Sequence, residues 1–308
     1  MKITLDLTKL REEGKITDAE FEKLSQLAAE GTGSLAFNIL IGFGVIAVSC
    51  GLLALAPNAA TSVVVGLVVG GGGLALYNAR WKQWQILAHI CVLVGALLLG
   101  GGMVILGKAS VTTFLAIAIG FALAGVIARS GLLIVGSVLA LSSSLGSRTD
   151  YMHASYFLGI QEPTATIVVF SLLGVAAYQL SKRLGSDYER LAITAARTSV
   201  FLVNLGFWVG SLWGDGYQQL KIAIGDWVFA VLWAVALVGT GIWAARANRR
   251  WVVNVVAVFA AIHFYTQYFE RLGAQPATIL IAGLIALGFA AALWNFNRRL
   301  WGRTTALK

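Results

Sequence analysis

The chain has 308 residues, of which 58% are hydrophobic and 12% are charged, whereas about 25% of the residues in a soluble domain are charged. No soluble core could bury so much apolar surface, so the composition excludes an ordinary water-soluble protein. The net charge of +9 does not predict nucleic-acid binding, because the basic residues fall in short connectors between apolar runs. We therefore expect an integral membrane protein.

Residues 1–34 form a polar segment that precedes the first apolar run, and we call this segment the preamble. Within it, Thr17 is followed three residues later by Glu20, which is the spacing of a capping box. This pattern predicts a helix that starts at Asp18, and Gly31 is expected to end it.

An earlier short helix over residues 7–13, ending at Gly14, would complete a helical hairpin in the cytoplasm. Phe21, Leu24 and Leu27 line one side of the second helix. That apolar side is our candidate surface for binding a protein partner.

The preamble also resembles a known type of module. The residues that carry the likeness are Leu7, Leu10, Gly14, Ile16, Thr17, Glu20, Phe21 and Leu24. They resemble the SHOCT type of short helical module, which is known mainly as an appendage of membrane or oligomeric proteins. SHOCT modules usually sit at a C-terminus, and the N-terminal position here resembles a bacterial family of predicted membrane proteins of unknown function. The alternative is an unrelated amphipathic hairpin, because capping boxes are common.

Apolar runs then predict ten membrane spans. They cover residues 35–56, 60–77, 84–106, 110–128, 131–145, 164–181, 198–213, 227–245, 251–268 and 277–296. The first run has 22 residues without charge, and a helix of that length rises about 33 Å, enough to cross a bilayer. The predicted fold is all-α, a polytopic bundle over residues 35–297 with a basic cytoplasmic tail over residues 298–308.

The fifth run, 131–145, is short for a span, and the distribution of charge decides in its favour. With ten spans and a cytoplasmic start, 19 of the 23 lysines and arginines face the cytoplasm, as the positive-inside rule requires. Removing the fifth span would place the richest basic clusters outside. We therefore expect both termini in the cytoplasm, and the resemblance to the bacterial family implies that the membrane is the bacterial inner membrane. Five spans in each half would suit two inverted repeats, although no such repeat is visible in the sequence.

The last two spans resemble the corresponding spans of the same uncharacterised bacterial family. The residues that carry this likeness are Arg249, Arg250, Asn254, Tyr268, Phe269, Glu270, Gly283, Asn297, Arg298 and Arg299. The family implies the membrane architecture and brings no activity, cofactor or site residue.

The densest polar cluster within a span is in the ninth, where His263, Gln267 and Glu270 share one helical face. Such a face could relay protons or bind a cation. Alternatively, Gln267 and Glu270 lie at the outer interface and His263 bonds to a neighbouring helix. Together with Asn204 and Trp233, these three residues are our candidate substrate-binding residues.

The sequence predicts no catalytic residues, cofactor site or metal site. The acidic residues of the outer loops match no metal-site spacing, and no nucleotide-binding or hydrolase motif is present. Gly206 and Gly210 form a GxxxG pattern that suits helix packing, within one chain or across a homodimer.

Two functions follow from these patterns. The first is a transporter-like carrier of small neutral or lipophilic solutes, with a cavity near His263, Asn204 and Trp233, because buried charge is scarce. The second is a membrane scaffold or regulatory subunit that docks a membrane or cytoplasmic protein through the preamble.

Overall fold

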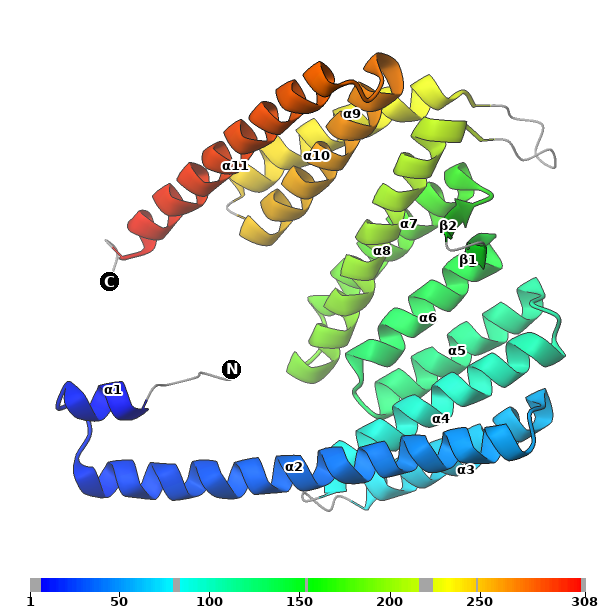
Figure 1. Ribbon diagram of the computed structural model, residues 1–308, viewed down its shortest axis with the longest axis vertical. Helices are drawn as coiled ribbons and strands as arrows, with labels where there is room; N and C mark the ends of the chain where they lie inside the picture. The colour runs from blue at the N-terminus through cyan, green and yellow to red at the C-terminus, as the bar shows by residue number, and fades with distance from the viewer. Residues whose placement is uncertain (1–6, 80–83, 153–154, 216–223, 248, 306–308) are drawn as a thin grey trace. The chain divides into compact units, whose positions relative to one another are not determined.

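The computed structural model describes residues 7–79, 84–152, 155–215, 224–247 and 249–305, and Figure 1 traces them. The chain forms two compact units. Unit 1 comprises Met1–Ser144 and Leu180–Thr194, and unit 2 comprises Leu145–Gln179 and Ala195–Lys308.

Helices make up nearly all of the described chain, and their positions follow the apolar runs. They are α1 (Leu7–Glu12), α2 (Asp18–Leu55), α3 (Ala59–Asn78), α4 (Gln85–Leu106), α5 (Val111–Ile127), α6 (Gly131–Ser144), α7 (Pro163–Ser181), α8 (Ser186–Trp213), α9 (Asp226–Arg246), α10 (Arg250–Leu272) and α11 (Pro276–Thr305). From α3 to α6, the predicted ends agree with the structure to within one residue.

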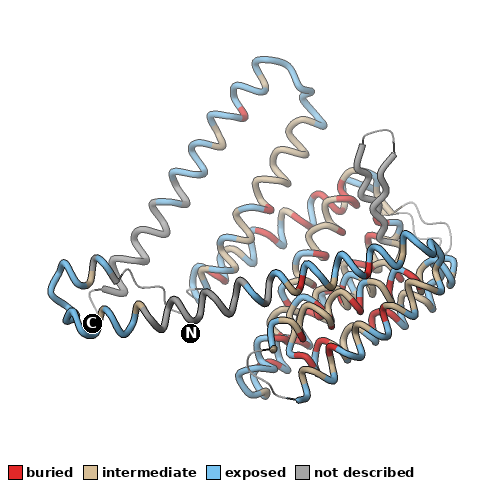
Figure 2. Tube along the Cα trace, turned by 60° about the horizontal axis from the view of Figure 1, so that its bottom comes forward, coloured by how far each residue is buried: buried red, intermediate tan, exposed pale blue. Residues whose placement is uncertain are grey.

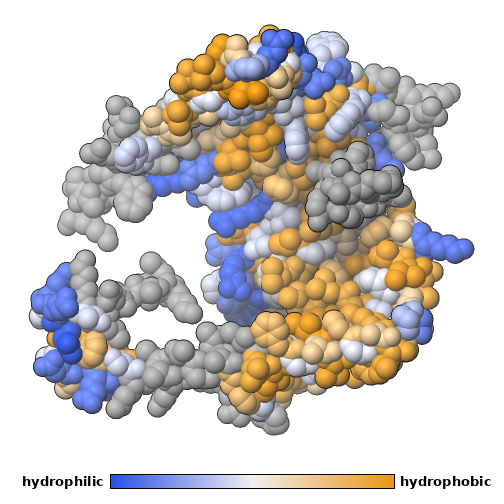
Figure 3. All heavy atoms as spheres, in the orientation of Figure 1, coloured by the Kyte–Doolittle hydropathy of each residue, from blue (hydrophilic) through white to orange (hydrophobic). Residues whose placement is uncertain are grey.

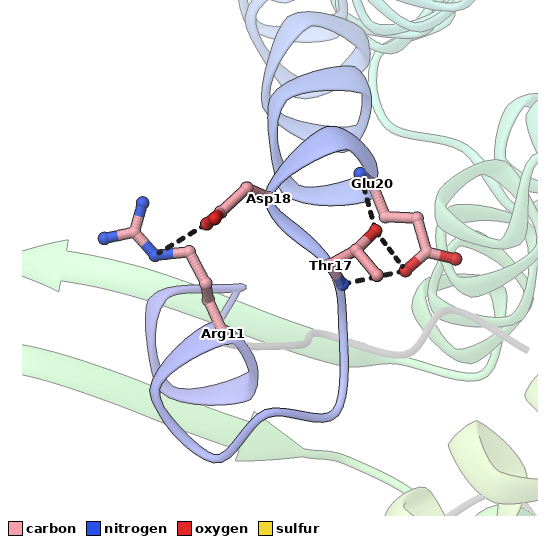
Figure 4. Close-up of polar contacts among 4 residues, drawn as sticks. All are labelled: Arg11, Thr17, Asp18 and Glu20. Carbon is pink, nitrogen blue, oxygen red and sulfur yellow. Dashed lines mark hydrogen bonds and ion pairs between the residues drawn. The ribbon is translucent and has the colours of Figure 1, made fainter.

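The start of α2 confirms the predicted cap (Figure 4). The Thr17 hydroxyl accepts a hydrogen bond from the backbone N–H of Glu20 at 3.3 Å, and the Glu20 carboxylate accepts one from the Thr17 backbone N–H at 2.9 Å. The predicted short helix before it is also present as α1, and Gly14 follows it with a φ of 67°. Arg11 of α1 lies 4.0 Å from the Asp18 carboxylate.

The predicted end of this helix at Gly31 is wrong, because α2 continues without a break from Asp18 to Leu55. A glycine ends a helix when it adopts a left-handed conformation, whereas Gly31 stays helical. Lengthening an existing helix requires only one more residue to be fixed for each new bond, whereas a new helix needs a fresh nucleus. The preamble and the first apolar run therefore share one helix.

In unit 1, glycines bring α3 and α4 into backbone contact. The buried residues of α3 are Gly66 and Gly73, and Figure 2 shows in red where buried residues lie along the helices. A Cβ placed on Gly95 of α4 would lie 2.3 Å from the backbone nitrogen of Gly70. Glycine at these positions lets the two backbones approach.

Polar side-chain contacts hold the turn between α5 and α6 against the beginning of α8, also within unit 1. Arg129 occupies this turn with a φ of 50°, and its guanidinium forms an ion pair with Asp187. In return, the Arg190 guanidinium donates a hydrogen bond to the Arg129 carbonyl at 3.3 Å. These contacts explain why Leu180–Thr194 belongs to unit 1.

The connector after α6 contains a β-hairpin that the sequence analysis did not predict. Strand β1 (Ser147–Met152) pairs antiparallel with β2 (Ser155–Ile160), with Ser147 opposite Ile160. Gly146 precedes β1 with a φ of 88°, a conformation that favours glycine. This two-stranded ribbon is the only sheet in the described part of the chain.

The surface of the helices has the character of a membrane protein. Six described helices, α3, α4, α7, α8, α9 and α10, are long and apolar enough to cross a bilayer. Shorter apolar helical stretches cover Leu40–Leu55, Val111–Ile127, Gly131–Ser144 and Pro276–Ala291. Figure 3 shows apolar residues over the later part of α2 and over the neighbouring helices of unit 1, where a soluble protein would present polar ones.

We expect Gly95→Ala to destabilise the protein by about 1–3 kcal/mol, because the new methyl group would push α3 and α4 apart. Gly101→Ala is the matched control on α4, since a Cβ at Gly101 has no heavy atom within 4 Å, and it should change stability by less than about 0.5 kcal/mol. Unfolding of purified protein in mixed micelles measures both. Equal stability of the two variants would contradict the glycine contact.

The capping box predicts a pH dependence at the start of α2. Hydrogen bonds from the Thr17 backbone N–H and hydroxyl lower the pKa of the Glu20 carboxyl below its ordinary value. The cap is therefore fully formed above the ordinary glutamate pKa and is lost as the pH falls through the lowered one. Thr17→Ala should raise the Glu20 pKa toward its ordinary value, which an NMR titration of the carboxyl carbon would detect. An unchanged titration would rule out the hydrogen bond from the Thr17 hydroxyl to the Glu20 carboxylate.

Candidate functional site

Three of the five predicted substrate-binding residues come together in unit 2. Asn204 lies on α8, Trp233 on α9 and His263 on α10. Trp233 stands between the other two, since it bonds to the Asn204 side chain and its ring packs against that of His263. We call these three residues the α8–α10 cluster.

The indole of Trp233 forms the centre of the α8–α10 cluster. Trp233 is only 1% exposed, and its Nε1–H donates a hydrogen bond to the Asn204 Oδ1 at 3.0 Å. The Asn204 amide in turn donates to the Val200 carbonyl at 2.8 Å. Buried polar groups need such partners, particularly in a membrane. Both side chains are therefore held in fixed positions.

His263 meets this pair edge-on. Its ring lies 4.8 Å from the Trp233 ring, centroid to centroid, at an interplanar angle of 70°. The Nδ1 atom of His263 is buried and has no hydrogen-bond partner among the described residues. An imidazole nitrogen in that position can accept or donate one further hydrogen bond, according to its protonation.

Apolar side chains enclose the cluster. Trp233, Leu237 and Phe259 form a buried core, against which Phe207, Trp208 and Ile262 pack among others. The ring of Phe207 is stacked on that of Trp233, with 6.5 Å between the centroids. The side chain of Trp233 thus occupies the space that a bound solute would need between Asn204 and His263.

Gln267 and Glu270 do not join the α8–α10 cluster. Gln267 Nε2 donates to the Ser211 carbonyl of α8 at 3.4 Å, and Glu270 is exposed near the end of α10. The residues predicted to share one face of this helix therefore lie in different environments. Gln267 takes part in the packing of α10 against α8, whereas Glu270 is exposed near the end of α10.

The sequence analysis missed two further polar contacts of α10. Trp208 Nε1 donates to the Thr266 hydroxyl at 2.9 Å, and the Tyr265 hydroxyl donates to the Ala282 carbonyl of α11 at 2.7 Å. The spacing of Asn204, Trp208 and Ser211 on one face of α8 carried a signal for the first of them. Both contacts fix helix against helix.

Phe21, the first residue of the predicted partner surface, is partly covered by the chain itself. The Arg11 guanidinium lies 4.6 Å above the centre of the Phe21 ring, and this cation–π contact helps to hold α1 against α2. Leu24 is 40% exposed. The side chain of Leu27 lies outside the described residues. Leu24 is thus the accessible described member of this surface.

Metal ligands do not gather in the described part of the chain, where no three His, Cys, Asp or Glu side chains form a group that could hold an ion. Cys50 and Cys91 are both free thiols.

Comparison with known proteins gives no family for this chain. No protein-family model, curated protein or solved structure matches it. What the chain does must therefore be inferred from its own residues.

A double-mutant cycle tests the hydrogen bond at the centre of the α8–α10 cluster. Asn204→Ala and Trp233→Phe each remove one partner, and we expect a coupling energy of about 0.6–1.7 kcal/mol between them. Unfolding in mixed micelles gives the four stabilities. The control pairs Asn204→Ala with Trp243→Phe, because Trp243 is 55% exposed on the same helix. That cycle should be additive within about 0.5 kcal/mol, and equal coupling in the two cycles would refute the contact.

Proposed function

We propose that the chain crosses the inner membrane of a bacterium ten times and keeps both termini in the cytoplasm. The six long apolar helices and the four shorter apolar stretches support this number. The placement of 19 of the 23 basic residues on one side supports the orientation. The likeness of both chain ends to the uncharacterised bacterial family is consistent with it and stays a prediction.

Within this architecture, the function that the geometry supports best is that of a membrane scaffold or regulatory subunit. The observation that carries it is the continuity of α2. The helix runs from its cap at Thr17 to Leu55, and the first apolar run of the sequence begins at residue 35. The preceding 17 residues of the helix rise about 25 Å. A partner held at the preamble would therefore be joined to the membrane bundle by one unbroken helix.

The preamble is suited to bind another protein. It carries the capping box, the α1–α2 hairpin held by Arg11, and the accessible apolar side chain of Leu24. An amphipathic helix of this kind docks its apolar side into the groove of a partner. The partner is a membrane or cytoplasmic protein, and movement or rotation of the preamble would be transmitted along α2.

Site-specific photo-crosslinking in living cells tests the scaffold function. A photoreactive amino acid replaces Leu24 in the full chain, and Lys23, which is exposed on the neighbouring side, is replaced in the control. We expect discrete protein adducts at position 24 and several-fold fewer at position 23. Equal labelling at both positions, or no protein adduct at position 24 in correctly inserted protein, would overturn the proposal.

A second function, a carrier of small neutral or lipophilic solutes, is favoured by one observation, the buried Nδ1 of His263, which has no hydrogen-bond partner in the described part of the chain. Such an atom is available to a passing solute or proton. The carrier ranks second because Trp233 fills the adjacent space. Transport into proteoliposomes distinguishes the two. A carrier requires wild-type vesicles to take up protons or a neutral solute faster than empty ones, and requires His263→Ala to slow that uptake.

A further inference from the structure

A groove in unit 1 takes no part in either function discussed above. It runs between α3, α4 and α5 and has a cavity volume of about 220 Å³. The residues that line it are apolar throughout, with glycines on its floor and Leu67, Met103 and Phe121 among its walls. Among the described residues, no charged or hydrogen-bonding side chain lines it.

The groove is open to the side, toward the surroundings of the helices. Gly71 of α3 and Gly120 of α5 both line it and are exposed. A Cβ added to either would have no heavy atom within 4 Å. In a membrane, the surroundings at this depth are lipid chains, and an apolar hollow open to them will be filled by apolar groups.

The long direction of the groove follows the helix axes. Its lining extends from Gly66 to Leu74 on α3 and from Val92 to Met103 on α4. These stretches rise about 12 Å and 16 Å, close to the roughly 15 Å of one leaflet's hydrocarbon layer. The groove is thus parallel to the lipid chains and about as long as one leaflet is deep.

The width of the groove selects a single hydrocarbon chain over another helix. Its volume of about 220 Å³ spread over about 12 Å of helix rise gives a mean cross-section of about 18 Å². A helix is about 10 Å wide and would need roughly 80 Å². A whole helix would therefore not fit inside the groove.

One end of the groove changes from apolar to polar. Tyr77 lies one turn beyond Leu74 on α3, and His89 lies one turn before Val92 on α4. Their rings contact each other edge-to-face, with centroids 5.2 Å apart. Side chains with an apolar body and a polar tip are typical of the membrane interface. This end therefore suits the ester and headgroup of a lipid.

We propose that the groove between α3, α4 and α5 is a binding site for one acyl chain of a membrane phospholipid, with the lipid's polar end beside Tyr77 and His89. The occupancy does not depend on the scaffold function. The proposed topology places Tyr77 on the cytoplasmic side, so the lipid would belong to the cytoplasmic leaflet. This assignment rests on the proposed topology.

Photolabelling of the full-length protein tests the site. The protein is reconstituted into vesicles of phosphatidylethanolamine and phosphatidylglycerol that contain a trace of phosphatidylethanolamine with a diazirine on one acyl chain. Adducts are then mapped by mass spectrometry. We expect the groove-lining peptides of α3, α4 and α5 to be labelled at least fivefold more than the equally exposed, lipid-facing side of α9. Uniform labelling of all outward-facing helices would overturn the proposal.

Substitutions that fill the groove without disturbing the protein sharpen the test. Gly71→Leu and Gly120→Leu place a side chain in the open groove and should reduce its labelling at least fivefold. Gly72→Leu is the matched control, because Gly72 is exposed, has open space around its Cβ and does not line the groove. It should leave the labelling within twofold of wild type. Equal labelling of all three variants would contradict the site.

The position of the diazirine reports the direction of the lipid. A diazirine near the carboxyl end of the chain should label residues near Leu74, and one at the methyl end should label residues near Gly66. The reverse order would overturn the placement of the polar end. Adducts that join two copies of the chain through groove residues, in place of lipid adducts, would assign the groove to an interface and refute the lipid site.

Discussion

The backbone of this chain must satisfy its own hydrogen bonds wherever it passes through hydrocarbon, and the remaining features follow from that constraint. A helix meets it within a single segment. The ten apolar stretches are accordingly helical in the described chain. Proline appears where a missing amide does least harm, since Pro163 and Pro276 are the first residues of α7 and α11.

Once each helix is complete, the two units hold their helices together in different ways. In unit 1, α3 and α4 meet through glycines, and dispersion contacts between close backbones stabilise the pair. In unit 2, α8, α9 and α10 meet around Trp233 and its bond to Asn204. The glycine contact of unit 1 leaves an apolar groove beside it, whereas in unit 2 the side chain of Trp233 fills the space between the helices. That difference is why the proposed lipid site lies in unit 1, although the sequence directed attention to unit 2.

Much of the fold could be predicted from hydropathy, because the apolar runs of the middle of the chain are separated by polar connectors. The cap at Thr17 was also predictable, since it depends on neighbouring residues alone. The continuation of α2 through Gly31 was not predictable in this way, because a glycine after a polar helix usually indicates the end of that helix. The β-hairpin escaped prediction because its pairing depends on the meeting of two strands, and polar residues obscure its alternation.

The candidate site could likewise be predicted only in part. Asn204, Trp233 and His263 were chosen as polar or amphipathic side chains within spans, and the need of such groups for partners brings them together. Gln267 and Glu270 were added by spacing along one helix, which says nothing about the depth at which each residue sits. The groove of α3 to α5 had no sequence signal of its own beyond glycine content, because an open hollow arises only from the packing of three helices.

The most direct measurement of the central claim, an even number of crossings with both ends inside, is the accessibility of single cysteines in cells. Cys50→Ala and Cys91→Ala provide the background, into which Lys15→Cys, Ser147→Cys and Thr305→Cys are introduced one at a time. With a membrane-impermeant maleimide, the account predicts labelling of position 147 in intact cells, and of positions 15 and 305 only after the membrane is opened. Labelling of positions 15 and 305 from opposite sides of the membrane would contradict it.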